Sequence, residues 1–187
     1  MRGGVHYEQE VWSALVAFSV GSFLSSCNFA PPGTYFEEAV LNVNLITPFG
    51  GQAVLNSFAQ PSVKLVPGTK DRAAPMARKE IVENQIQNVE TNLGKIKALP
   101  DSEETRDMVQ ISIRLHELVL QAYKTEYLEL AKLYDEGGSE GERLLKAQGI
   151  DTKYLTGYQA LFRRLIELGR TFAAKHNIKV DWQTRLF

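Results

Sequence analysis

The chain has 187 residues, a formal net charge of −1 and 44% hydrophobic residues. This length fits one folded domain with appendages, and the apolar fraction is that of a globular rather than a disordered protein. The near-zero charge argues against a general nucleic-acid-binding protein, because such proteins usually carry a basic excess. The single cysteine excludes an internal disulfide, so the fold must rely on packing alone.

The N-terminal region contains an apolar run, Val11 to Leu24, that ends in Leu24-Ser25-Ser26-Cys27. A short apolar segment followed by small residues is typical of a secretory signal peptide. The residues before the run are roughly neutral instead of basic, which leaves two alternatives. One is a retained membrane helix over residues 11–29, which is nearly long enough to span a bilayer. The other is a buried core helix with an ordinary buried cysteine.

Leu24-Ser25-Ser26-Cys27 resembles the lipobox of bacterial lipoprotein precursors. The resemblance implies that residues 1–26 are removed and that Cys27, as the new first residue, carries acyl chains. Each buried CH₂ contributes about 0.8 kcal/mol, so two or three chains hold a folded domain on a bilayer. Asn28 is not the aspartate that resembles an inner-membrane retention signal. We therefore expect attachment to the bacterial cell envelope, facing the periplasm, with the outer membrane favoured over the inner.

Residues 27–74 are expected to form the lipid attachment and a partly irregular covering segment. Prolines and glycines interrupt this stretch, so long regular elements are not expected. Its many apolar side chains predict that it covers a groove of the domain; an exposed patch for a partner is the alternative. Residues 36–46 could form one short helix or an extended stretch, and residues 52–58 another short helix.

Residues 75–187 show the three- and four-residue apolar spacing of amphipathic helices. The first predicted helix has Pro75 in its first turn and stops near Leu99, before Pro100. The second runs from Ser102 to Glu136 and opens with a capping box of Asp101 and Glu104. The apolar positions of these two helices are Val82, Ile86, Val89, Leu93 and Ile96 in the first, and Met108, Ile111, Leu115, Leu118 and Ala122 in the second.

A further capping box, Ser139 with Glu142, predicts a short helix that ends at Gly149. Asp151 or Thr152 then opens the last long helix, and Asn177 is its expected left-handed stop. The apolar positions of that helix are Tyr154, Tyr158, Leu161, Leu165, Leu168 and Phe172. The predicted fold is all-α: an antiparallel bundle of three long helices plus short helices, preceded by a partly irregular apolar segment.

Few residues suggest chemistry. His116 lies in the middle of a helix without a second ligand at metal spacing, and His176 lies near a helix C-terminus, so both are interpreted as structural. The acidic, Gly-rich run 135–142 lacks the alternating ligands of a calcium loop and is interpreted as a turn. Glu126 and Glu129 are expected on a solvated helix face beside lysines. We predict no catalytic residues, metal or cofactor.

The tyrosines are the best candidates for a partner or ligand groove, because an aromatic layer with hydroxyls at its edge suits binding. They are Tyr123, Tyr127 and Tyr134 on the second helix, and Tyr154 and Tyr158 on the last. Leu155-Thr156-Gly157-Tyr158-Gln159 resembles one copy of the repeated motif of the Spy and CpxP periplasmic proteins. The whole chain is also similar to small helical lipoproteins of Bacteroidetes.

These features predict a non-enzymatic, lipid-anchored helical protein that acts as an adaptor or accessory subunit. Its partners would be the membrane, through lipidated Cys27, and an unidentified protein, with no nucleic acid. The alternatives are a periplasmic chaperone resembling Spy, and a single-pass subunit of a membrane complex that retains residues 11–29.

Overall fold

The computed structural model describes residues 30–60 and 62–182. Cys27 and the apolar run before it lie outside the described residues. In chain order, the elements are α1 (Pro32–Ala39), the 3₁₀ helix η1 (Leu41–Ile46), α2 (Gly51–Ala59), β1 (Val63–Leu65), β2 (Ala73–Pro75), α3 (Arg78–Lys97), α4 (Arg106–Ala122), the π-helical turn η2 (Tyr123–Tyr127), α5 (Leu128–Asp135), α6 (Glu140–Ile150), the π-helical turn η3 (Asp151–Leu155) and α7 (Thr156–Lys175).

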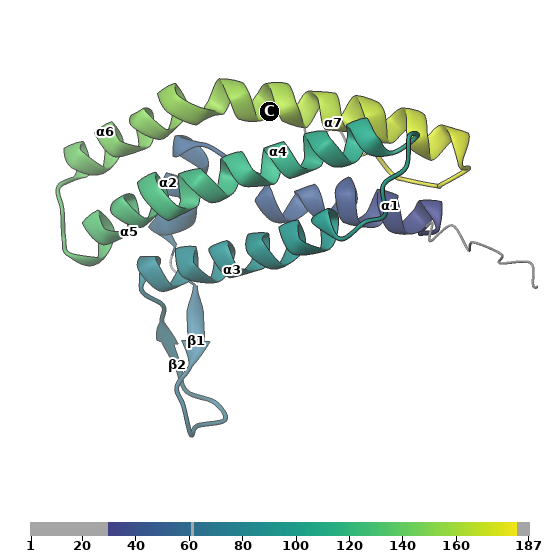
Figure 1. The fold of residues 1–187 in the computed structure, drawn as a ribbon. Helices are drawn as coiled ribbons and strands as arrows, with labels where there is room; N and C mark the ends of the chain where they lie inside the picture. The colour runs from purple at the N-terminus through teal and green to yellow at the C-terminus, as the bar shows by residue number, and fades with distance from the viewer. Residues whose placement is uncertain (1–29, 61, 183–187) are drawn as a thin grey trace, which may run out of the picture.

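Three long helical rods make up the bundle (Figure 1). The first is α3, the second is α4–η2–α5, and the third is α6–η3–α7. Successive rods run in opposite directions, and α4 packs against both α3 and α7. The prediction of an all-α antiparallel bundle of three long helices with additional short helices is therefore confirmed.

The residues predicted for the helix seams fill the interior. Val82, Ile96, Leu115 and Leu165 are each fully buried, and the remaining seam positions are buried or half-buried. Burial of a leucine-sized side chain stabilises a fold by about 1.5–3 kcal/mol, so this stripe of contacts is the main support of the bundle.

The segment before the bundle packs into the same hydrophobic core. Tyr35, Phe36, Val40, Ile46 and Phe58 are all at most 3% exposed. Helix α1 contacts α3, α4 and α7, while α2 lies against α6. Residues 36–46 form neither of the two expected structures, because α1 ends at Ala39 and a separate 3₁₀ helix follows. The predicted helix over 52–58 is confirmed as α2.

A short antiparallel hairpin, β1 with β2, was not expected from the sequence. It pairs Val63 with Pro75, Lys64 with Ala74 and Leu65 with Ala73. In Figure 1 it projects from the bundle beside the start of α3. Pro75 consequently belongs to a strand, and the prediction that it sits in the first turn of a helix is wrong; α3 begins at Arg78.

The expected break between α6 and α7 is absent from the structure. The helix continues through η3, and Gly149 lies inside α6. Asp151, the predicted cap, instead accepts a hydrogen bond of 2.6 Å from the backbone N–H of Gly51. Because that carboxylate is bound to α2, it no longer competes for the backbone of its own helix.

The predicted capping box at the start of α4 is also wrong, since α4 begins at Arg106 and lacks a side-chain cap. The carboxylate of Asp101 binds the Arg106 guanidinium at 2.8 and 3.1 Å, and Glu104 binds residues of α7. Both carboxylates thus bind cationic side chains instead of the backbone N–H groups of a capping box. The box of Ser139 with Glu142 is confirmed, with both reciprocal bonds formed.

The end of α7 follows the sequence prediction. Asn177 has φ of +54°, and the N–H of Ile178 donates to the Ala173 carbonyl at 2.9 Å. This is the left-handed stop expected for asparagine at that position. The chain then turns back, and Trp182 packs edge-on against Phe36 at a centroid distance of 5.8 Å.

Candidate functional site

Three of the five candidate tyrosines form one aromatic cluster. They surround the ring of Phe49, which belongs to the covering segment before the bundle. Phe49 stacks on Tyr158 with ring centroids 4.5 Å apart, and it lies 5.8 Å from Tyr127 and 6.4 Å from Tyr123. All four rings are at most 5% exposed. The neighbouring helices thus bring the tyrosines together as predicted, but Phe49 fills the space between them.

The hydroxyls of this cluster bind backbone groups. The N–H of Gly50 donates to the Tyr127 hydroxyl at 3.0 Å, and the Tyr158 hydroxyl donates to the Ile46 carbonyl at 3.1 Å. Burial raises the pKa of Tyr158 to about 12, and it raises the pKa of Tyr123 and Tyr127 further. All three hydroxyls therefore stay protonated near neutral pH, and those of Tyr127 and Tyr158 hold the covering segment in place.

The two π-helical turns meet this same segment. Tyr127 from η2 binds the backbone of Gly50, and Asp151 from η3 binds the backbone of Gly51. Gly50 has φ of +122°, a conformation that L side chains rarely adopt. The π-helical turns η2 and η3, where the helices are locally wider, thus both contact the Gly50–Gly51 pair.

The other two tyrosines lie elsewhere. Tyr154 is buried, with its hydroxyl 3.4 Å from that of Thr125 and the Lys153 ammonium 5.0 Å from its ring. Tyr134 is half-buried near the C-terminal end of α5, and its ring lies edge-on to that of Phe58 with the centroids 5.4 Å apart. The five candidate residues are consequently divided among three places.

His116 is fully buried in a chain of polar contacts. Its Nε2 lies 2.9 Å from the Asn92 amide nitrogen, and its Nδ1 lies 2.8 Å from the Ser112 carbonyl. Asn92 Oδ1 in turn accepts from the Asn42 amide at 2.7 Å. With Nε2 as acceptor and Nδ1–H as donor, the neutral imidazole satisfies every bond, and burial lowers the pKa of His116.

Glu126 is another residue whose surroundings differ from the sequence interpretation. It is bound by Lys146 at 2.6 Å and by Lys153 at 2.9 Å, and Lys146 also contacts Glu129. Those lysines come from α6 and η3, and their hydrogen bonds lower the pKa of Glu126. The carboxylate therefore joins two rods of the bundle, whereas the sequence placed it on a solvated face.

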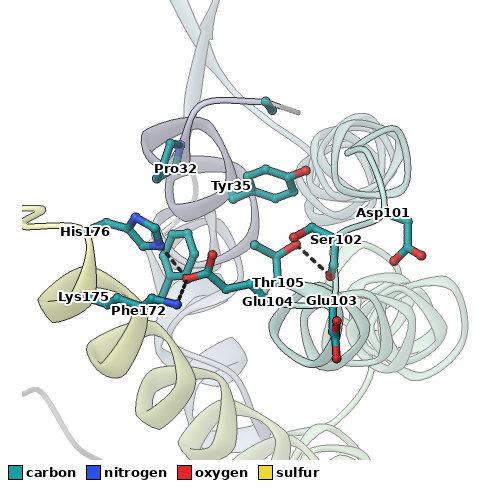
Figure 2. A pocket seen from close by; sticks show the side chains of 11 residues that line it. Pro32, Tyr35, Asp101, Ser102, Glu103, Glu104, Thr105, Phe172, Lys175 and His176 are labelled. Atoms are coloured by element: carbon teal, nitrogen blue, oxygen red, sulfur yellow. Dashed lines mark hydrogen bonds and ion pairs between the residues drawn. The ribbon is translucent and has the colours of Figure 1, made fainter. Parts of the chain in front are cut away.

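A cavity of about 700 Å³ lies at the end of the bundle where α1 begins. Its walls come from the start of α1, the turn between α3 and α4, and the end of α7. Figure 2 shows His176 and Lys175 converging on Glu104 across this cavity. Glu104 lies 2.6 Å from His176 Nε2 and 2.9 Å from Lys175 Nζ.

These contacts join the end of the α3–α4 turn to the C-terminal end of α7. Hydrogen bonds from Lys175, followed by those from His176, lower the pKa of Glu104. Tyr35 closes the cavity from α1 and donates to the Pro100 carbonyl at 2.8 Å. The sequence interpreted His176 as a structural residue at a helix end, and its ring stacks on Phe172 at 4.3 Å. The arrangement offers a cavity with apolar and polar walls, in which the Glu104 carboxylate is bound by two residues from the end of α7.

Sequence reasoning missed this cavity because its residues come from three stretches of the chain that are more than 60 positions apart and show no shared spacing. A comparison of the chain with known protein families, with curated proteins and with solved structures finds no match. Among residues 30–60 and 62–182, no cluster of histidine, cysteine and acidic residues could hold a metal ion. Within the same ranges, no helix is both long and apolar enough to cross a bilayer.

Proposed function

We propose that this protein is a lipid-anchored, non-enzymatic helical protein of the bacterial cell envelope that acts as an adaptor or accessory subunit. The observation that carries the proposal is the position of the lipobox-like Leu24-Ser25-Ser26-Cys27 directly before the fold. Helix α1 begins at Pro32, five positions after Cys27. An acyl group on that cysteine would tether the folded domain with almost no linker.

The reach of the chain defines which end would face the lipid. Consecutive residues span at most about 3.6 Å, so a segment of three residues, the separation of Cys27 from Ala30 in the sequence, reaches at most about 11 Å. Ala30 and Pro32 line the cavity that holds Glu104 and His176. A lipid on Cys27 would therefore hold this end of the bundle at the membrane surface, in the periplasm and with the outer membrane favoured.

The exposed hairpin is the feature that supports the proposal of a protein partner. Val63 and Leu65 point to one face of β1 and are 65% and 63% exposed. The 20 residues of α3 separate the hairpin from the α3–α4 turn at the cavity, which is about 30 Å at 1.5 Å per residue. An exposed apolar ribbon held away from the membrane suits a role in which the domain presents a contact surface.

Intact mass spectrometry of the protein extracted from membranes tests the anchor. The expected mass is that of residues 27–187 plus acyl chains, and the Cys27→Ser variant should keep its N-terminal segment and gain no lipid. An uncleaved wild-type chain with a free thiol would contradict the proposal and support the single-pass alternative.

Site-specific photo-crosslinking in cells tests the partner surface. A crosslinker at Leu65 should capture a partner that a crosslinker at Arg163, on the exposed face of α7, does not. Equal labelling from both positions, or none from Leu65, would remove the hairpin as the contact surface.

A further inference from the structure

A second cavity, of about 590 Å³, lies at the end of the bundle opposite the first one. Helix α2 contributes Leu55 and Phe58, and α6 contributes Leu144, which is 47% exposed at the rim. Tyr134 of α5 forms a further wall. The cavity thus combines apolar side chains with polar ones and opens to solvent.

Two arginines flank the same tyrosine ring at this cavity. The guanidinium carbon of Arg143 lies 4.3 Å from the centroid of Tyr134, and that of Arg78 lies 5.8 Å from it. Arg78 is held in place because its Nε and Nη2 donate to the Phe58 carbonyl at 3.3 and 3.1 Å. Stacking on an aromatic face fixes a guanidinium plane while its donors remain available in that plane.

Arg143 has hydrogen-bonding capacity that the described residues do not use. Its Nε is buried, and it has no acceptor within residues 30–60 and 62–182. A buried donor without a partner destabilises a structure, so a ligand that supplies the acceptor would recover part of that loss on binding. Glu140 is the single carboxylate among the lining residues, against two guanidinium groups.

We infer that this cavity binds a small amphipathic carboxylate, with its carboxylate on Arg143 and Arg78 and its apolar chain over Leu55 and Phe58. A carboxylate matches the planar fork of a guanidinium, since two parallel N–H···O bonds can form at once. This binding goes beyond the proposed adaptor role and holds whether or not Cys27 is acylated.

Titration of the full chain with hexanoate, followed through the Nε–H resonance of Arg143 by NMR, tests the inference. We expect a saturable shift of that resonance with hexanoate and none with hexanamide, which has the same chain without the charge. Arg143→Gln should weaken hexanoate binding at least about tenfold, since a hydrogen bond to a charged group contributes about 1.5–3 kcal/mol. Binding by this variant is followed through the hexanoate signals.

Three further variants make the test specific. Arg163→Gln, which removes an exposed arginine on α7, should leave hexanoate affinity unchanged. Glu140→Gln should tighten binding about two- to fivefold because it removes the opposing charge. Arg143→Lys keeps the positive charge but loses the planar fork of the guanidinium, so this variant should bind hexanoate more weakly than the wild type does. It provides a second test of the inference in case Arg143→Gln does not fold. Absence of saturable binding, equal binding of hexanamide, or wild-type affinity in Arg143→Lys would overturn the inference.

Discussion

The contact between α2 and α6 gives the sharpest test of the packing, because it depends on the absence of one side chain. A Cβ atom placed on Gly51 would lie 2.0 Å from the Ala147 carbonyl oxygen and 2.9 Å from Asp151 Oδ2. Contacts of a Cβ below 3.0 Å are essentially never seen. Gly51→Ala must therefore push α2 away from α6 by about 1 Å.

The expected loss of stability has two overlapping parts. Overpacking of a close contact destabilises a fold by about 1–3 kcal/mol. The displacement also stretches the 2.6 Å bond from Gly51 N–H to Asp151, and a bond to a charged acceptor contributes about 1.5–3 kcal/mol. We expect Gly51→Ala to lower the free energy of unfolding by about 2–5 kcal/mol, which corresponds to roughly 5–15 °C in Tm for a chain of this size.

Urea unfolding of the purified chain, followed by circular dichroism, measures this effect. The matched control is Gly149→Ala, one residue from the end of α6, where a Cβ meets nothing within 4 Å. That change should raise the free energy of unfolding by about 0.5–1 kcal/mol, because alanine favours a helix interior. If Gly51→Ala unfolds at the wild-type urea concentration, the close packing of α2 on α6 is refuted.

Three other changes probe the buried network, a cap and the seam. Because burial lowers the pKa of His116 below about 6.5, the unfolded chain gains a proton first as pH falls; stability should be full above that pH and decline below it. His116→Gln should lose less stability than the wild type between about pH 7 and pH 5 in urea titrations, and equal losses would exclude His116 as the cause. Ser139→Ala removes the cap of α6 and should cost about 1 kcal/mol by thermal unfolding, with Ser57→Ala, an exposed position of α2, as a near-neutral control. Leu115→Asp buries an unpaired charge at a fully buried position and should abolish the cooperative transition, and a retained one would contradict the seam.

Much of the helical architecture follows from the sequence. The three- and four-residue spacing in residues 82–96 and 154–172 places apolar side chains on one face, so most of the buried seam was predictable, although Phe162 is buried and was not among the predicted positions. The cap at Ser139 and the left-handed stop at Asn177 were also predictable, because each depends on groups within a few positions along the chain.

The errors occur where a side chain binds a distant element. Asp151 was expected to cap its own helix and instead binds Gly51, 100 positions away. The acidic run 135–142 contains the predicted turn, but the sequence did not indicate that Asp135 accepts from the N–H groups of Arg78 and Lys79 at 2.9 and 3.0 Å, at the start of α3. A local pattern cannot distinguish these uses of a carboxylate, since the competing donors are brought near only by folding.

The sequence alone therefore determined the class of fold, its helix faces and the position of a lipobox-like cysteine ahead of the domain. Only the tertiary structure decided that Phe49 fills the space among the tyrosines, that Glu104 joins two helix ends, and that Arg78 and Arg143 share one ring. The physical reason is that hydrophobic spacing acts between neighbours in the chain, whereas cavities and ion pairs depend on residues that meet only after the helices pack.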